Sequence, residues 1–499
     1  MRLLVTKFGG TSVGSAEAIR GLTAITARNR ESWDQVVVVV SALSGVTDSL
    51  LRIVRTAQGG DAEGVRALYA TLRERHHGVI EELLAAERPA VLTDIDTLLD
   101  ECAALCEGVR VLGELTPRTL DAIAGLGERM SARIVAATLR EHGITATAID
   151  ATDLIVTDDR DQDASPLMSE TTERTTARLG ILLEQGATPV VTGFIGATLA
   201  GVRTTLGRGG SDWSAAIVGA ALEASEVWIY TDVDGVLTAD PRIVPDARVI
   251  HTLSYNEVSE LAYFGAKVLH PKTIRPVVER GIALRVKNTF NPDHAGTLIV
   301  QHNERIAGAI KAVTSVHSLS LITVAGRGML GVPGIAARTF AAVARQDASI
   351  LMISQASSEQ SICFVIPASG INAVVDSLRQ ELAAEIERRD IDSVSVDANV
   401  AIITAVGAGM RGTSGVAKRV FGVVGDAEIN VIAIAQGSSE CAISLVVHEE
   451  DAKPAVRAIH TLTHTEAIAA HHRAPCELFR WPVAGDRWPV FNAAAQRYV

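Results

Sequence analysis

The sequence predicts an α/β protein in which a mostly parallel sheet, flanked by helices, is followed by two copies of a smaller βαββαβ unit. Three observations support this fold class. Strand-like and helix-like segments alternate in the first part of the chain, as in parallel sheets covered on both faces. From about residue 300 the sequence repeats itself, because the segment that begins at Thr323 recurs without a gap at Thr404. The 499 residues suffice for about two to four domains.

The expected elements of the first part follow one another in a regular order. The strands are expected at 3–8, 35–41, 145–150, 189–193, 227–232 and 283–287. The helices are expected at 16–30, 63–86, 93–112, 117–141, 170–184, 213–222 and 255–264. The stretch 59–112 contains no strand candidate and is interpreted as a helical excursion from the sheet. The apolar run 36–40 is too short to cross a bilayer and predicts a strand buried on both faces.

Each copy of the repeat predicts a strand, a glycine loop, a helix, two strands and a second helix, the last at 372–388 and 451–462. Both copies carry the motif Gln-x-Ser-Ser-Glu, at Gln355 and Gln436. The glycines could simply permit close packing of helix and strand. The shared glutamine motif instead favours a site for a small polar ligand.

Composition limits the possible partners and compartments. The net charge of −12 argues against a nucleic-acid partner. The five cysteines are scattered, and the helical spacing of Cys102 and Cys106 predicts buried thiols rather than metal ligands. We expect no metal site of the protein's own, no signal peptide, no membrane segment and a reduced, cytoplasmic setting.

A lysine precedes a glycine turn at the end of the first strand, in the order Lys7-Phe8-Gly9-Gly10. Backbone N–H groups at such a turn can cradle a phosphate, and a lysine adds a point charge. A Walker P-loop has its lysine after the glycines, so this would be a phosphate site of another design. Taken alone, the motif is equally compatible with an ordinary tight turn. Lys7 and Asp232 both fall at the carboxyl ends of strands, where parallel sheets bind ligands.

The most specific segment is TLGRGGSD, which ends at Asp212. Three glycines around Arg208 let the backbone approach a ligand, and arginine suits bidentate binding of carboxylate or phosphate. Ser211 is expected to be the N-cap of the next helix, which Asp212 would begin. A solvated loop is the alternative.

Four further segments are candidates for binding. Thr231 and Asp232 end a buried strand and, with Arg242, could hold a nucleotide's base and ribose, although a turn rich in Asp and Gly is an alternative. Lys267 could reach phosphates. Glu128 opens a helix and could hold an ammonium group, or be a plain helix-start acid. A polar run after the second expected strand ends at Thr47.

These parts suit a kinase whose acceptor is a carboxylate. A carboxylate with a pKa near ~4 is ionised at neutral pH, so no general base is needed. The task is to offset its repulsion from the phosphates of ATP with lysine, arginine, Mg²⁺ and backbone N–H groups. The chain offers Lys7, Arg208 and Lys267, and we identify no Ser-His-Asp or Cys-His set.

The motifs KFGGTSVG, GRGGSD, YTDVDGV, DPR and FGAKVLHP, followed by the tandem repeat, resemble aspartate kinase. That family has the amino acid kinase fold and two C-terminal ACT domains, and the resemblance covers about residues 2–475. It implies the reaction ATP plus L-aspartate giving 4-phospho-L-aspartate and ADP, the entry to lysine, threonine and methionine synthesis. Two alternatives are a catalytically silent amino-acid sensor and a kinase for another acceptor, such as glutamate or acetylglutamate.

The resemblance also implies roles for individual residues. The phosphate-binding turn would be formed by Lys7, Gly9 and Gly10, and Asp212 would organise the lysine and the transferring phosphate. Arg208 would grip the substrate carboxylate, while Thr47, Glu128 and Ser211 would complete the aspartate site. ATP, with Mg²⁺, would be held by Thr231, Asp232, Arg242 and Lys267. Leu237 departs from the family, since some relatives have a tyrosine there, near the adenine.

Domains and regulation follow from the same resemblance. The kinase domain is expected at 1–300, a linker at 301–315, the first ACT domain at 316–398, the second at 399–475 and an unassigned tail at 476–499. The last strand of the second range would complete the first ACT domain. A regulatory amino acid, lysine or threonine or both, would bind through residues of the two copies: Gln355, Gln436, Ser349 and Asn430. A homodimer or a dimer of dimers, formed through the ACT domains, is expected.

Overall fold

The structure is a computed structural model that describes residues 1–265, 269, 271–301, 306–329, 332–355, 360–437 and 439–466. Lys267 and the tail 476–499 lie outside these residues.

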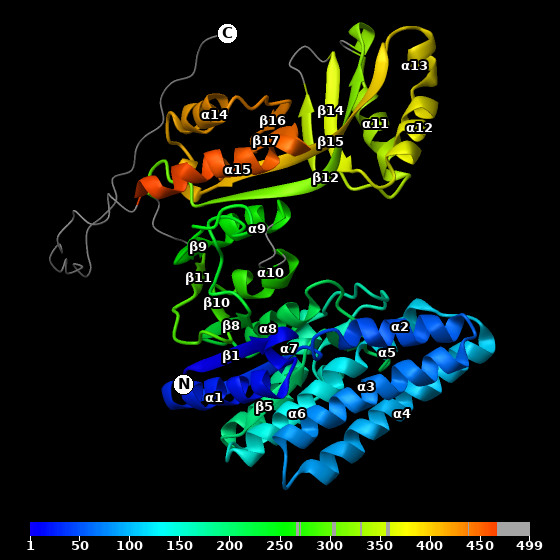
Figure 1. Cartoon of the computed structure of the whole chain (residues 1–499), viewed down its shortest axis with the longest axis vertical. Coiled ribbons are helices and arrows are strands. Elements are labelled where there is room, and N and C mark those ends of the chain that lie inside the picture. Colours follow the sequence, from blue (N-terminus) through cyan, green and yellow to red (C-terminus); the bar gives the residue numbers. More distant parts are fainter. Residues whose placement is uncertain are drawn as a thin grey trace, which may run out of the picture. The chain divides into compact units, whose positions relative to one another are not determined.

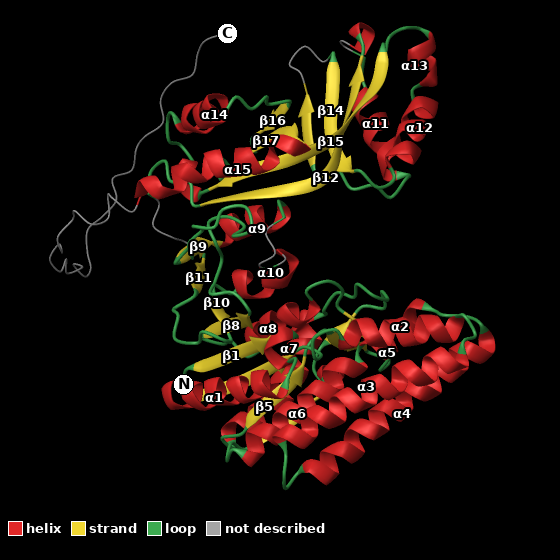
Figure 2. Ribbon diagram, in the orientation of Figure 1, coloured by secondary structure: helices red, strands yellow, loops and turns green. Residues whose placement is uncertain are grey.

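The first part of the chain folds around an eight-stranded sheet (Figures 1 and 2). Across the sheet the strands are β3 (Ala146–Ile149), β5 (Thr188–Thr192), β2 (Gln35–Val40), β1 (Leu3–Phe8), β8 (Glu226–Thr231), β10 (Ala283–Asn288), β11 (Thr297–Val300) and β9 (Thr252–Ser254). Among these described strands, only the β10–β11 pair is antiparallel. The predicted fold class, a mostly parallel sheet flanked by helices, is therefore confirmed.

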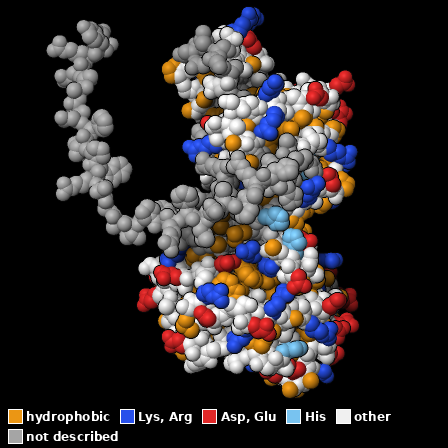
Figure 3. Space-filling view, turned by 90° about the vertical axis from the view of Figure 1, so that its left-hand side faces the viewer, with side chains coloured by type: hydrophobic (Ala, Val, Ile, Leu, Met, Phe, Trp, Pro, Cys, Tyr) orange, Lys and Arg blue, Asp and Glu red, His pale blue; other side chains and the backbone are white. Residues whose placement is uncertain are grey.

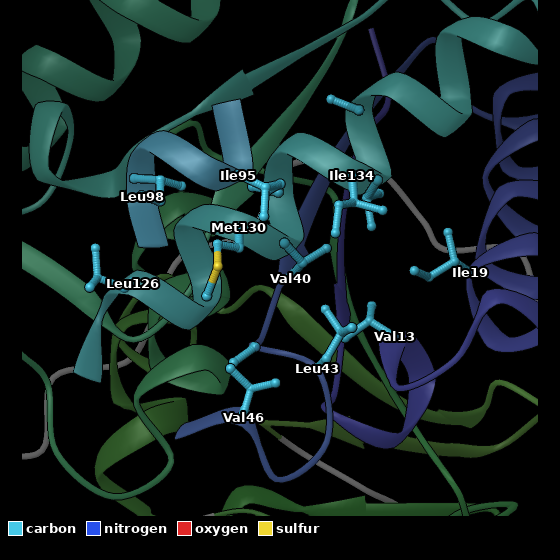
Figure 4. Close-up of a cluster of buried hydrophobic side chains, with 14 of the residues drawn as sticks. Val13, Ile19, Val40, Leu43, Val46, Ile95, Leu98, Leu126, Met130 and Ile134 are labelled. Carbon is cyan, nitrogen blue, oxygen red and sulfur yellow. The ribbon is translucent and has the colours of Figure 1, made fainter. Parts of the chain in front are cut away.

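Helices cover both faces of this sheet. One cluster of buried side chains joins one sheet face to α1 (Ala16–Ser32), α2 (Val46–Gln58), α3 (Ala62–Leu83), α4 (Arg88–Leu112), α5 (Pro117–Ala124) and α6 (Leu126–Glu141). A second cluster joins the other face to α7 (Met168–Glu184), α8 (Gly210–Ala221), α9 (Tyr255–Tyr263) and α10 (Pro271–Glu279). Val38 belongs to the first cluster and Val37 and Val39 to the second, so β2 is buried on both faces as expected. Figure 4 shows part of the first cluster, where Val40 of β2 lies among side chains of α2, α4 and α6.

The expected helix 117–141 is two helices, α5 and α6, separated at Gly125. A Cβ at Gly125 would lie 2.6 Å from Cγ2 of Ile195, so the break sits where another segment packs directly against the backbone. Ile195 begins β6 (Ile195–Thr198), which forms a small sheet with β4 (Val156–Thr157) and β7 (Arg203–Thr205). Neither this sheet nor α2 was predicted.

The internal repeat is a structural repeat. The two copies share one six-stranded sheet in the order β13-β14-β12-β15-β17-β16. The first copy contains β12 (Ala312–Ala325), α11 (Ile335–Ala344), β13 (Met352–Gln355), β14 (Ser361–Pro367) and α12 (Ile371–Glu381). The second contains β15 (Ser393–Val406), α14 (Val416–Asp426), β16 (Ala433–Ala435), β17 (Ala442–His448) and α15 (Ala452–His460). The short α13 (Ala383–Glu387) follows α12, where one helix was expected.

The central strands β12 and β15 are antiparallel and pair along their whole length. Ala312 lies opposite Val406 and Ala325 lies opposite Ser393, so the first residue of each strand faces the last residue of the other, and the pairing relates the two copies symmetrically. β12 begins at Ala312, inside the range expected to be a linker.

No helix in the described part of the chain is both long and apolar enough to cross a bilayer. On the described part of the face in Figure 3, acidic and basic side chains are interspersed rather than gathered by sign.

Candidate active site

Lys7 lies near the end of β1, directly before the glycine turn. Its side chain is largely buried, and its Nζ lies 2.6 Å from Oδ1 of Asp212, an acid in the first turn of α8. A carboxylate is favoured there because the helix dipole is positive at this end. The lysine head is therefore held at the carboxyl end of β1 instead of being solvated.

The glycine turn packs closely against its neighbours. A Cβ at Gly9 would lie 3.4 Å from the Nζ of Lys7, and one at Gly10 would lie 3.2 Å from the carbonyl oxygen of Ala42. The Gly9 N–H donates to the carbonyl of Tyr230 on β8 (3.2 Å), so that amide is already used within the fold. A Cβ at Gly10 would therefore press on the loop after β2, whereas one at Gly9 would make ordinary contact with the lysine head.

The helix after the Arg208 loop begins earlier than expected. α8 starts at Gly210, and its N-cap is Gly209 in the left-handed conformation (φ 74°), which glycine adopts without strain. Ser211 is therefore not the N-cap and lies inside the first turn. The prediction that Ser211 caps the helix was wrong because Gly209, two residues earlier, is the N-cap.

Six of the predicted residues meet at one cavity of 690 Å³. They are Lys7, Thr47, Glu128, Arg208, Ser211 and Asp212. The remaining lining includes Ser41, Asp48, Leu51, Arg55, Leu120, Asp121, Ala124, Gln162, Phe194 and Thr205. The structure thus brings together segments that lie far apart in the sequence.

Glu128 forms a buried acidic wall of this cavity. It lies in the first turn of α6, is 4% exposed, and its Oε2 has no hydrogen-bond partner among the described residues. Burial raises the pKa of this carboxyl to about 7. Hydrogen bonds from the backbone of Ala42 and of Glu128 itself, and the charge of Lys7, lower the pKa but only partly offset the effect of burial. A buried carboxyl with a free oxygen is suited to an ammonium group.

Arg208 lies on the loop between β7 and α8. Its side chain is exposed at the cavity and has no hydrogen bond or ion pair to another described residue. A free guanidinium can bind a carboxylate through two parallel hydrogen bonds. The cavity therefore offers an anion grip at Arg208 and a cation grip at Glu128.

Among the described residues predicted to bind nucleotide, only Lys7 lines this cavity. Thr231 ends β8, and its hydroxyl donates to Asp232 (3.1 Å). Arg242 pairs with Asp240 (2.6 Å) and lines a second cavity of 730 Å³ together with Leu237. The other predicted contact, Lys267, lies outside the described residues.

The predicted regulatory residues differ in their surroundings. Gln355 ends β13 and lines a cavity of 360 Å³ with Met329, Gly334 and Ile335. All four of these predicted residues are exposed, Gln355 included: Gln355, Gln436, Ser349 and Asn430.

The lining residues that were not predicted include Arg55 and Asp121. Arg55 lies two helical turns after Thr47, with Leu51 between them, and this spacing on α2 was the available signal. Asp121 is buried among backbone donors that only the folded chain brings to it. Within the described ranges, no three His, Cys, Asp or Glu side chains are grouped to hold a metal ion.

Comparison with known proteins shows the family to which the chain belongs. Residues 2–288 match the model of the amino acid kinase family, and residues 322–382 and 403–462 match that of the ACT domain. Aspartokinase 1, chloroplastic, of Arabidopsis thaliana is 34% identical over 464 residues, which cover 91% of this chain and 79% of the relative. The chain belongs to the aspartokinases of the amino acid kinase family.

Other relatives are longer. Bifunctional aspartokinase/homoserine dehydrogenase 2, chloroplastic, of Arabidopsis thaliana is 38% identical over 464 residues, 92% of this chain and 50% of the relative. The chain thus spans about half the length of such relatives.

The fold also matches solved aspartokinase structures. E. coli aspartokinase III in complex with aspartate and ADP has a TM-score of 0.77 and 31% identity, covering 92% of this chain and 99% of that one. The same protein in complex with lysine and aspartate has a TM-score of 0.75 and covers 93% and 99%.

Proposed function

We propose that this chain transfers the γ-phosphoryl group of ATP to the side-chain carboxylate of L-aspartate, as an aspartate kinase. The observation that carries the proposal is the single cavity around which a paired lysine, a free arginine and a buried glutamate meet. A similar chain, E. coli aspartokinase III, binds aspartate and ADP.

The two grips account for an amino acid with a second carboxylate. Arg208 would bind the α-carboxylate and Glu128 the α-ammonium group, which leaves the side-chain carboxylate to face Lys7. The hydroxyls of Thr47 and Ser211, which also line the cavity, can donate to carboxylate oxygens. An acceptor held at both ends reacts in a fixed position, which is a main source of rate enhancement.

Lys7 supplies the charge that the transfer needs. The acceptor carboxylate is already ionised at neutral pH, so the protein's task is to offset repulsion between anions. Asp212 keeps the Lys7 ammonium at the end of β1, 2.6 Å away, where it can stabilise the transferring phosphoryl group.

ATP would extend from Lys7 toward the loop after β8. Thr231 and Asp232 lie at the end of that strand, and Arg242 and Leu237 line the neighbouring cavity. The Asp232 carboxylate is exposed and accepts a hydrogen bond from the neutral Thr231 hydroxyl, so it is suited to Mg²⁺ accompanying ATP. The ion would neutralise charge on the β- and γ-phosphates.

Regulation would reside in the repeat. The first ACT domain would bind its amino acid beside Gln355, in the 360 Å³ cavity. The E. coli relative binds lysine. We propose lysine, threonine or both as effectors here and a homodimer or dimer of dimers as the assembly.

The direct test is ADP release in the presence of ATP and Mg²⁺. We expect release to require L-aspartate, and we expect glutamate and acetylglutamate to be poor replacements. A folded preparation without added effector that shows no aspartate-dependent turnover would contradict the proposal. Efficient use of another acceptor would support phosphoryl transfer but contradict L-aspartate as the substrate.

A further inference from the structure

Asp121 lies on α5 at the wall of the active-site cavity and is 2% exposed. Its Oδ2 accepts the backbone N–H groups of Gln162 (2.9 Å) and Thr205 (3.2 Å), and its Oδ1 accepts the Thr205 hydroxyl (2.8 Å). Both carboxyl oxygens are therefore engaged within the protein. Burial raises the pKa of this carboxyl, while these three donors favour its charged form.

The three hydrogen bonds join α5 to two segments beside Arg208. Thr205 is the last residue of β7, three positions before Arg208. Gln162 has a left-handed backbone (φ 63°), which is unfavourable for a residue with a side chain and needs outside support. A Cβ at Gly207 would lie 2.9 Å from the Gln162 carbonyl oxygen, so this loop lies directly against the Arg208 loop.

The other end of β7 is tied to the helix that carries Glu128. Arg203, the first residue of β7, pairs with Glu101 of α4. Glu101 also pairs with Arg129 (2.9 Å), the residue after Glu128 on α6. Asp121 and Glu101 therefore hold opposite ends of the strand whose loop presents Arg208, and Glu101 connects it to the start of α6.

We propose that Asp121 is a positioning residue that fixes the separation between Arg208 and Glu128 and so selects the length of the amino-acid substrate. This inference rests on the proposed function, since it takes Arg208 and Glu128 to be the carboxylate and ammonium grips. If the hydrogen bonds of Asp121 are weakened, the Arg208 loop can move relative to α6. The site then holds aspartate less well and discriminates less against its longer homologue, glutamate.

The test compares Asp121→Asn with Thr205→Val and with the wild-type chain. The asparagine keeps the shape, and its oxygen can still accept the two backbone N–H groups while its NH₂ group faces the Thr205 hydroxyl. The negative charge that strengthens these hydrogen bonds is lost, so we expect the aspartate KM to rise by up to about tenfold. The ATP KM should change less than about twofold, and the ratio of kcat/KM for glutamate to that for aspartate should rise. Thr205→Val removes a single hydrogen bond and should shift the same quantities less.

Asp96→Asn is the matched control, because Asp96 is bound to Arg73 and His77 between α3 and α4, away from the cavity. It should leave both KM values unchanged. An Asp121→Asn variant that melts like wild type with an unchanged aspartate KM, or with equal losses for both substrates, would overturn the inference. If that variant does not fold, either of these results in Thr205→Val would overturn it instead. A wild-type chain that does not turn over aspartate would overturn the proposed function as well, so the two failures are distinguishable.

Discussion

The Nζ of Lys7 and the Oδ1 of Asp212 lie 2.6 Å apart, and their side chains are only 11% and 20% exposed. One comes from the first strand of the sheet and the other from the helix after the Arg208 loop. A pair in this environment is screened little by solvent, so it holds the lysine in one position before any phosphate arrives. Preorganised charge of this kind needs no rearrangement during the reaction.

Replacing Lys7 should therefore remove catalysis more than binding. We expect Lys7→Met to lower kcat by roughly 10²- to 10³-fold, as when another preorganised stabilising group is lost. The aspartate KM should change little, because the two amino-acid grips remain. Steady-state ADP release measures both constants. Lys418→Met, at an exposed lysine of α14, is the control, and an equal effect of the two substitutions would contradict the assignment.

Glu128 should make aspartate binding depend on pH. Its pKa, raised by burial to about 7, leaves much of the carboxyl neutral below pH 7, and only the ionised form attracts an ammonium group. We expect the aspartate KM to fall as pH rises from 6 to 8, by up to about tenfold per unit below the pKa. Glu128→Gln should bind weakly and without this dependence. A wild-type KM that is flat across this range would disprove the role.

The same shift predicts the sign of a stability change. The pKa in the folded chain is above the ordinary value of 4.5, so the folded state binds the proton more tightly than the unfolded state. The contribution of Glu128 to stability is therefore full below about pH 4.5 and lost as pH rises through about 7. The difference in melting temperature, Glu128→Gln minus wild type, should therefore be more positive at pH 8 than at pH 5. Thermal melts at the two values decide this, and the opposite order would be inconsistent with a raised pKa.

Arg208 should act on one substrate only. Arg208→Ala is expected to raise the aspartate KM from several-fold to about a thousandfold, because a charge-assisted bidentate contact is lost. Arg208→Lys keeps the charge without the fork and should fall between. The ATP KM should stay within about twofold for both variants. Initial rates with each substrate varied in turn test this, and equal losses for ATP and aspartate would exclude a dedicated carboxylate grip.

Feedback should depend on the glutamines of the repeat. We expect Gln355→Ala and Gln436→Ala to raise the effector concentration for half-inhibition while turnover without effector stays unchanged. The measurement is an inhibition curve with lysine, with threonine and with both together. Because the two substitutions occupy matched positions, the larger shift identifies the copy that binds the effector. Unchanged curves in both variants would remove the glutamines from the regulatory site.

The parts that the sequence predicted best depend on local pattern. β1 was predicted to the residue, and β2, β3, β5, β8 and β10 to within one residue at each end, because buried strands form apolar runs between turns. The short strands β9 and β11, at one end of the sheet, were not predicted. Lys7, Arg208 and Asp212 stand out because glycines surround them. The break at Gly125 depends on Ile195, which is distant in sequence, so the continuous helical pattern of 117–141 hid it. Asp121 went unnoticed for the same reason, since its donors come from two later segments.

Glu257 of α9 connects elements of the kinase part with those of the repeat. It is 0% exposed and caps its own helix through the Ser254 N–H (2.7 Å). The same carboxylate pairs with Lys311, just before β12, at 3.1 Å, and accepts the backbone N–H of Ala408, just after β15, at 2.8 Å. A buried carboxylate with these partners depends on its cation, because removal of one partner leaves the other charge uncompensated.

Lys311→Met should accordingly destabilise the chain strongly. We expect a loss of about 3–5 kcal/mol in the free energy of unfolding, as for other broken buried pairs. Glu257→Gln should also destabilise, whereas the double variant should be more stable than the sum of the two losses implies, since no lone charge remains. Urea unfolding of the four proteins measures this coupling, with Arg275→Met, from an exposed pair on α10, as the control expected to change little. Strict additivity of the Lys311 and Glu257 losses would show that the two side chains do not act as a pair.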